Sequence, residues 1–99
     1  MIELKTLEEL KEFIESNTKV AIDFFATWCG PCKKIAPYFE QLSTLFPAIR
    51  FAKVNCDNVD LDEFRIQSLP TFIFFANGTE CDRIIGANKD ILNSTIAKM

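Results

Sequence analysis

Apolar and polar positions alternate along the chain in two patterns, one typical of strands and one typical of helices. A nearly continuous apolar run over residues 20–26 predicts a central strand covered on both faces, and Asp23 is its one polar residue. Further strands are predicted over 2–4, 50–55, 71–76 and 79–85. Apolar residues at helical spacing predict helices over 6–17, 31–46 and 59–64, and a last helix after Asn88.

Capping and turn residues sharpen several of these boundaries. Thr6 and Glu9 form a capping box at the start of the first helix, and Asn77-Gly78 predicts a type I′ hairpin turn. Pro37 lies inside the helix over 31–46 and should kink it. That helix is expected to bury Ile35, Tyr38, Phe39, Leu42, Leu45 and Phe46. The last helix is expected to bury Ile91, Leu92 and Ile96.

The order of these elements predicts an α/β fold. Crossover helices link the first three strands, so these strands should be parallel, while the hairpin adds two antiparallel strands. The expected architecture is a single three-layer α/β/α domain over residues 1–99, with a five-stranded mixed sheet flanked by four helices. Apolar residues make up 48% of the chain, enough for a core that needs neither a metal nor a disulfide framework.

Charge and composition exclude several classes of function. The formal charge is -3 with both signs mixed along the chain, which argues against a nucleic-acid surface or a polybasic membrane anchor. No apolar run is long enough to cross a membrane, and residues 1–5 do not resemble a signal peptide, so a cytoplasmic location is expected. The chain has no histidine, which removes the Cys–His dyad and every histidine-containing metal site.

Cys29 and Cys32 are the strongest candidates for chemistry because they lie where a strand gives way to a helix. The free N–H groups of a helix start stabilise a thiolate, so the thiol pKa falls. Pro31 suits the first helical turn, and Gly30 permits close approach of a partner chain. The spacing places Cys32 one turn further on and partly shielded. We therefore expect Cys29 to attack a substrate disulfide and Cys32 to resolve the mixed disulfide.

Two structural alternatives compete with this interpretation. In the first alternative the pair forms half of a Cys₄ zinc site. Zinc needs a second close pair, and Cys56 and Cys81 are far apart in sequence, so no metal is expected. Two inert buried cysteines would fit poorly with the intervening Gly-Pro. Cys56 and Cys81 themselves are interpreted as structural rather than regulatory.

Over essentially its whole length the sequence resembles the thioredoxin family. The matching residues are Asp23-Phe24, Ala26, Trp28-Cys29-Gly30-Pro31-Cys32, Lys33, Ala36-Pro37, Lys53-Val54, Leu69-Pro70-Thr71, Asn77-Gly78 and Gly86-Ala87. A Cys-x-x-Cys motif alone is a weak signal, but this set in this order is highly specific. The resemblance implies the thioredoxin fold, with the third strand between the first and second, and a cis peptide bond before Pro70.

The resemblance and the chemistry together assign roles around the dithiol. Burial should raise the pKa of Asp23, which would let it accept the proton of Cys32, although Asp23 as a satisfied core residue remains the alternative. Lys53 occupies the family position that tunes this carboxylate. The expected substrate-binding surface comprises Trp28, Gly30, Pro31, Leu69, Pro70, Thr71 and Ala87.

The expected function is reduction of protein disulfides by a monomeric electron carrier without a bound cofactor. The resemblance implies reducing equivalents from NADPH, delivered by a separate flavoprotein, thioredoxin reductase. Two alternatives stay open: an oxidant or isomerase of disulfides, and a redox-regulated binding subunit or scaffold. Gly30-Pro31 between the cysteines resembles the reducing members of the family.

Overall fold

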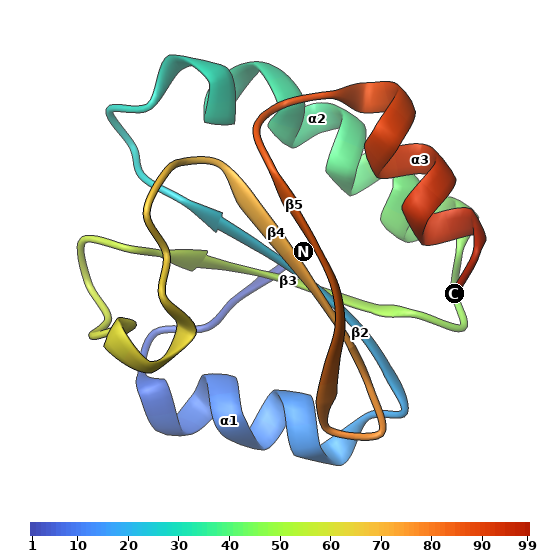
Figure 1. The fold of residues 1–99 in the computed structure, drawn as a ribbon, viewed down its shortest axis with the longest axis horizontal. Coiled ribbons are helices and arrows are strands. Elements are labelled where there is room, and N and C mark those ends of the chain that lie inside the picture. Colours follow the sequence, from blue (N-terminus) through green and yellow to red (C-terminus); the bar gives the residue numbers. More distant parts are fainter.

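The computed structural model describes residues 1–99 and contains one five-stranded sheet in the order β1-β3-β2-β4-β5 (Figure 1). The strands are β1 (Ile2–Glu3), β2 (Lys19–Phe25), β3 (Arg50–Asn55), β4 (Thr71–Ala76) and β5 (Thr79–Ile85). Strand β3 pairs in parallel with β1 and β2, whereas β4 pairs antiparallel with β2 and β5. The predicted mixed sheet, and the position of the third strand between the first and second, are therefore confirmed.

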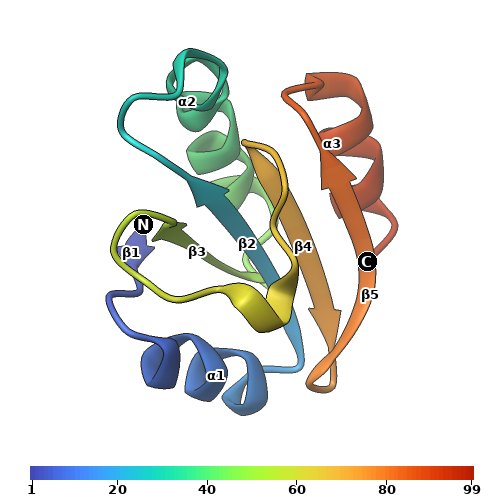
Figure 2. The ribbon, with the colours of Figure 1, turned by 60° about the vertical axis from the view of Figure 1, so that its left-hand side comes forward.

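Helices cover both faces of the sheet, as Figures 1 and 2 show. Helix α1 (Leu7–Ser16) lies on one face, and α2 (Gly30–Leu45) and α3 (Lys89–Ala97) lie on the other. Alternate residues of β2 divide between the two layers: Ile22 packs on the α1 side and Ala21 on the side of α2 and α3. Both clusters are fully apolar and buried, so the sheet is held between two separate cores.

The prediction of a fourth helix over 59–64 is wrong, because this segment forms only a single 3₁₀ turn, Asp62–Phe64. The Asp60 side chain accepts a hydrogen bond from the Asp62 N–H at 3.1 Å, which offers the backbone an alternative to an α-helix. Arg65 then takes a left-handed conformation (φ 54°) and ends the turn. The three-layer fold holds with three α-helices rather than four.

Two of the residues predicted to be buried on helices are exposed instead. Leu45 is 62% exposed and Ile91 is 50% exposed. Leu92 and Ile96 lie one turn apart on the inner face of α3, and Ile91 lies about 100° around the helix from Leu92. The buried stripe of a surface helix covers only part of its circumference, so Ile91 at the neighbouring apolar position faces solvent.

This difference predicts unequal effects of two alanine substitutions on α3. Leu92→Ala removes a fully buried side chain and should lower the free energy of unfolding by about 2–5 kcal/mol. Ile91→Ala, at the adjacent exposed position, should change it by less than about 1 kcal/mol. Urea unfolding of both variants measures the two values, and equal losses would contradict the placement of α3.

The predicted caps and turns are largely confirmed. Thr6 Oγ1 accepts from the Glu9 N–H at 3.1 Å, while the Glu9 carboxylate reaches the N–H of Lys5 rather than that of Thr6. Asn77 and Gly78 both have positive φ (52° and 82°), as a type I′ turn requires. The bond between Leu69 and Pro70 is cis.

Candidate active site

The dithiol lies where the chain leaves β2 and enters α2. Cys29 is the N-cap of α2, and its sulfur accepts a hydrogen bond from the Cys32 N–H at 3.2 Å. The two cysteines form a disulfide, with Cα atoms 5.3 Å apart. Pro31 occupies the first turn, where no N–H is needed. On reduction, the positive end of α2 would favour the thiolate of Cys29.

The two cysteines face different spaces, although both are at most 5% exposed. Cys29 lines a groove of about 800 Å³ together with Trp28, Pro31 and Leu69. Cys32 instead lines a smaller cavity of about 210 Å³ with Asp23 and Lys53. The groove is large enough for a peptide segment, whereas the cavity suits only small groups such as water.

Asp23 carries the clearest electrostatic perturbation in the chain. Burial raises the pKa of its carboxyl group from 3.8 to about 7, although the charge of Lys53 acts in the opposite direction. Asp23 and Lys53 are register neighbours on the parallel strands β2 and β3. Asp23 Oδ1 has no hydrogen-bond partner. A carboxyl group that titrates near neutral pH beside Cys32 can take up or give a proton during the reaction.

Trp28 is 70% exposed at the edge of the groove. Its indole Nε1–H donates to Asp57 Oδ2 at 2.9 Å, which fixes the ring. Asp57 belongs to none of the motifs identified in the sequence. Asp57 follows β3, which runs parallel to β2. Because the carboxyl ends of neighbouring parallel strands meet at one edge of the sheet, this position could have indicated that Asp57 lies near the dithiol.

The other residues of the expected substrate surface fall in three places. Trp28, Gly30, Pro31 and Leu69 share the groove with Cys29, whereas Ala87 lines a second hollow of about 470 Å³ that also touches Gly30 and Pro31.

Pro70 and Thr71 are buried instead. Thr71 Oγ1 donates to the Ser68 carbonyl at 2.6 Å, and the Pro70 carbonyl accepts from the Gly86 N–H at 2.9 Å. The Thr71 side chain and the Pro70 backbone therefore hold the loop, and Leu69 is its half-buried apolar member in the groove.

The two remaining cysteines are free thiols. Cys81 is exposed on β5. Cys56 is half-buried and lines the groove, a placement that the sequence did not indicate. Burial raises the pKa of Cys56 to about 11, and the charges of Asp23 and Asp57 add to this effect. Cys56 is therefore protonated and a poor nucleophile at neutral pH.

Other features of the structure bear on possible ligands. No group of three or more His, Cys, Asp or Glu side chains is arranged to hold a metal ion. None of the helices combines the length and the apolar character needed to cross a membrane.

The remaining residues that line the groove were not indicated by any sequence motif. They are Val59, Asp60, Leu61, Asp62, Arg65, Ile66, Gln67 and Ser68.

Comparison with known proteins gives a consistent answer. The thioredoxin family model matches residues 1–98. Thioredoxin H1 of Arabidopsis thaliana is 45% identical over 93 residues, which cover 92% of this chain and 82% of that protein. The structure of Plasmodium falciparum thioredoxin superposes with a TM-score of 0.97 at 38% identity, covering 99% of this chain and 98% of that one.

A yeast structure is similar to the same extent. It concerns the thiol resolving mechanism of mitochondrial 1-Cys peroxiredoxin via glutathione and thioredoxin systems, and it matches with a TM-score of 0.95 at 35% identity, covering 100% of this chain and 95% of that one. Sequence, fold and the paired cysteines at the start of α2 agree. The chain belongs to the thioredoxin family of disulfide-reducing oxidoreductases, and Cys29 and Cys32 are its redox-active pair.

Proposed function

We propose that the chain reduces protein disulfides in two steps with unequal roles for its cysteines. The Cys29 thiolate attacks one sulfur of the substrate disulfide, which forms a mixed disulfide and releases the first substrate thiolate. The Cys32 thiolate then attacks the Cys29 sulfur, which releases the second thiolate. The substrate gains two electrons, and the chain is left with the Cys29–Cys32 disulfide. The observation that carries this proposal is that Cys29 lines the groove whereas Cys32 lines the smaller cavity that contains Asp23.

Asp23 is proposed to accept the proton of Cys32 as Cys32 becomes a nucleophile. Its pKa of about 7 lies between 3.8, the ordinary value of an aspartic acid, and the higher value of a free thiol. Asp23 can therefore hold this proton at neutral pH. Lys53 is proposed to tune Asp23, because its charge opposes the effect of burial. Both side chains line the cavity that Cys32 faces.

The substrate is proposed to lie along the groove beside Cys29. Trp28, Gly30, Pro31 and Leu69 supply contact surface, and Ala87 extends it on the other side of Pro31. Pro70 and Thr71 are proposed to act through the loop backbone rather than through direct side-chain contact. An open groove around a reactive sulfur suits a partner that is itself a protein.

Family membership supports a proposal about the wider setting. We propose that NADPH supplies electrons through a separate flavoprotein thioredoxin reductase, and that the chain acts in electron transport in the cytoplasm as a monomer with a single domain over residues 1–99. No cofactor of its own is needed, since the two cysteines carry the electrons. We propose peroxiredoxins as one class of substrate, on the basis of the similar yeast structure.

Reduction of insulin disulfides by dithiothreitol tests the proposed activity. The chain should accelerate the precipitation of the reduced insulin chains well above the rate with dithiothreitol alone. Cys81→Ser should behave like the wild type, because Cys81 is exposed on β5 and does not line the groove. A wild-type rate equal to that of dithiothreitol alone would contradict the proposal and favour a binding role.

A further inference from the structure

Arg65 has an unusual backbone conformation in the wall of the groove. Its φ is 54°, in the left-handed region that glycine and asparagine occupy readily and that is unfavourable for other residues. Two hydrogen bonds hold it there. The Arg65 N–H donates to the Asp62 carbonyl at 3.2 Å, and the Arg65 carbonyl accepts from Arg83 Nη1 at 3.3 Å.

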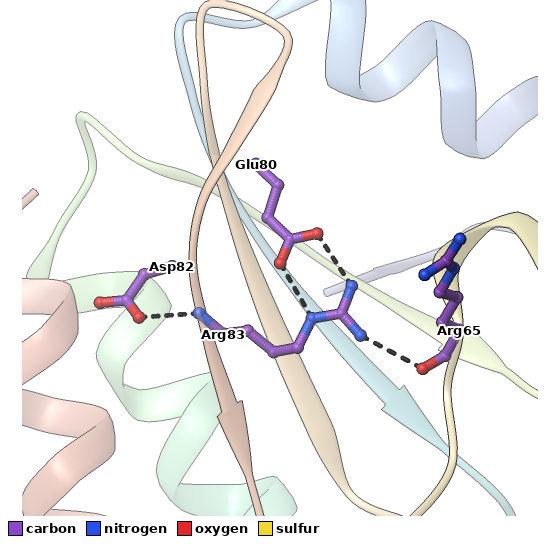
Figure 3. A network of polar contacts seen from close by, with 4 residues as sticks. All are labelled: Arg65, Glu80, Asp82 and Arg83. Carbon is purple, nitrogen blue, oxygen red and sulfur yellow. Dashed lines mark hydrogen bonds and ion pairs between the residues drawn. The ribbon is translucent and has the colours of Figure 1, made fainter.

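Arg83 is itself held in place on strand β5 (Figure 3). Its Nε and Nη2 donate to the two carboxylate oxygens of Glu80 at 2.9 and 2.8 Å. Such a two-point pair fixes the guanidinium plane, which leaves Nη1 free to reach the Arg65 carbonyl. The backbone of the groove wall is therefore fastened to the edge of the sheet at Arg65.

The guanidinium of Arg65 has no partner within the chain. In Figure 3 no dashed line joins it to Glu80 or Arg83, whose contact with Arg65 is made through the Arg65 carbonyl. The four ion pairs of the structure use other cations, and although Asp60 and Asp62 line the same groove, neither pairs with Arg65. Arg65 therefore lines the groove that holds Cys29, its backbone is held by two hydrogen bonds, and its guanidinium is unpaired.

We propose that Arg65 determines substrate specificity by binding a carboxylate of the segment that carries the disulfide. The inference rests on the proposed function, because the segment must enter the groove to reach Cys29. A guanidinium can donate two parallel hydrogen bonds to a carboxylate, which a lysine cannot do. Because the Arg65 backbone is already fixed, less conformational entropy is lost when the substrate binds. The preferred substrates are disulfides flanked by Asp or Glu.

Matched disulfide peptides test this inference. Each pair of peptides differs only by Glu or Gln, and the substitution is moved along both sides of the reactive cysteine. For wild-type protein we expect kcat/KM to favour Glu by about three- to tenfold at one or two positions. Arg65→Asn should bring this ratio to about one, and Arg65→Glu should reverse it. Arg65→Lys should retain a smaller preference, because it keeps the charge but loses the fork.

Two controls separate recognition from a general charge or folding effect. Lys98→Asn makes the same change of charge at an exposed position outside the groove, and it should keep the wild-type ratio. Arg65→Asn should not lower the midpoint of urea unfolding, because asparagine tolerates the left-handed backbone. A purely structural role for Arg65 would instead lower that midpoint and reduce kcat/KM for both peptides equally.

Three results would overturn the inference. The first is no Glu preference at any position in the wild type, and the second is a preference that survives unchanged in Arg65→Asn, which would assign it to other cations such as Lys34 or Lys89 beside Ala87. The third is the structural pattern described above. In all three cases the peptides are still reduced, so the proposed function stands. Failure of the wild type to reduce any peptide would overturn the proposed function and this inference with it.

Discussion

Replacing Cys29 by serine is expected to reduce insulin-disulfide reduction to the rate of dithiothreitol alone. The hydroxyl of serine is not ionised at neutral pH, and the other thiol of the groove, Cys56, is protonated because its pKa is raised to about 11. Cys32 lines the smaller cavity rather than the groove, so no thiolate is left to attack the substrate. Cys32→Ser is expected to lose turnover almost completely as well, for a different reason. Its Cys29 still attacks, but the mixed disulfide is not resolved internally.

Single-turnover kinetics separate these two defects. Cys32→Ser should release one substrate thiol per protein molecule in a rapid burst and then stop, whereas Cys29→Ser should show no burst. Cys81→Ser provides the matched control, because it removes one sulfur atom at an exposed position away from the groove. A burst of equal size with Cys29→Ser would contradict the assignment of Cys29 as the attacking residue.

Asp23→Asn is expected to stabilise the folded chain at alkaline pH by up to roughly 4 kcal/mol, the upper limit set by the difference between 3.8 and about 7 in the pKa of Asp23. Below about pH 4 the carboxyl group is protonated in both the folded and the unfolded state, so it makes no difference. Between about pH 4 and 7 the unfolded chain loses the proton while the folded chain keeps it. Asp23 therefore destabilises the wild type increasingly over this range and constantly above it.

Urea unfolding of the oxidised forms over this pH range measures the effect. The difference between Asp23→Asn and wild type should be small near pH 4, grow towards pH 7 and level off above it. Glu15→Gln neutralises an exposed carboxylate without an ion pair and should show no such trend. A difference that is independent of pH would mean that Asp23 is an ordinary hydrogen-bonded core residue.

The elements of the fold were predictable wherever local chemistry decides them. The apolar run of β2, the Thr6 cap and the Asn77-Gly78 turn each depend on residues close together in sequence. The strand order and the cis bond before Pro70 were expected only from the family resemblance. The segment over 59–64 was predicted wrongly because the spacing of apolar residues carries no information about the competing hydrogen bond that the Asp60 side chain accepts from the Asp62 N–H.

The dithiol was predictable from its position between a strand and a helix, but most of its surroundings were not. The contact between Trp28 and Asp57 spans 29 residues, and that between Arg83 and Arg65 spans 18. The first joins two loops at one end of the sheet and the second joins a loop to strand β5, and no pattern of apolar residues encodes either contact. The same applies to Cys56, which faces the groove only because β3 lies next to β2.

Trapping of mixed disulfides tests the unequal roles of the two cysteines most directly. Reduced Cys32→Ser and reduced Cys29→Ser are each mixed with a disulfide peptide, and the products are separated without reductant and analysed by peptide mass mapping. The predicted result is an adduct on Cys29 of the Cys32→Ser protein and none on Cys32 of the Cys29→Ser protein. Equal amounts of adduct on Cys29 of the first protein and on Cys32 of the second would contradict the assignment of Cys29 as the attacking and Cys32 as the resolving residue.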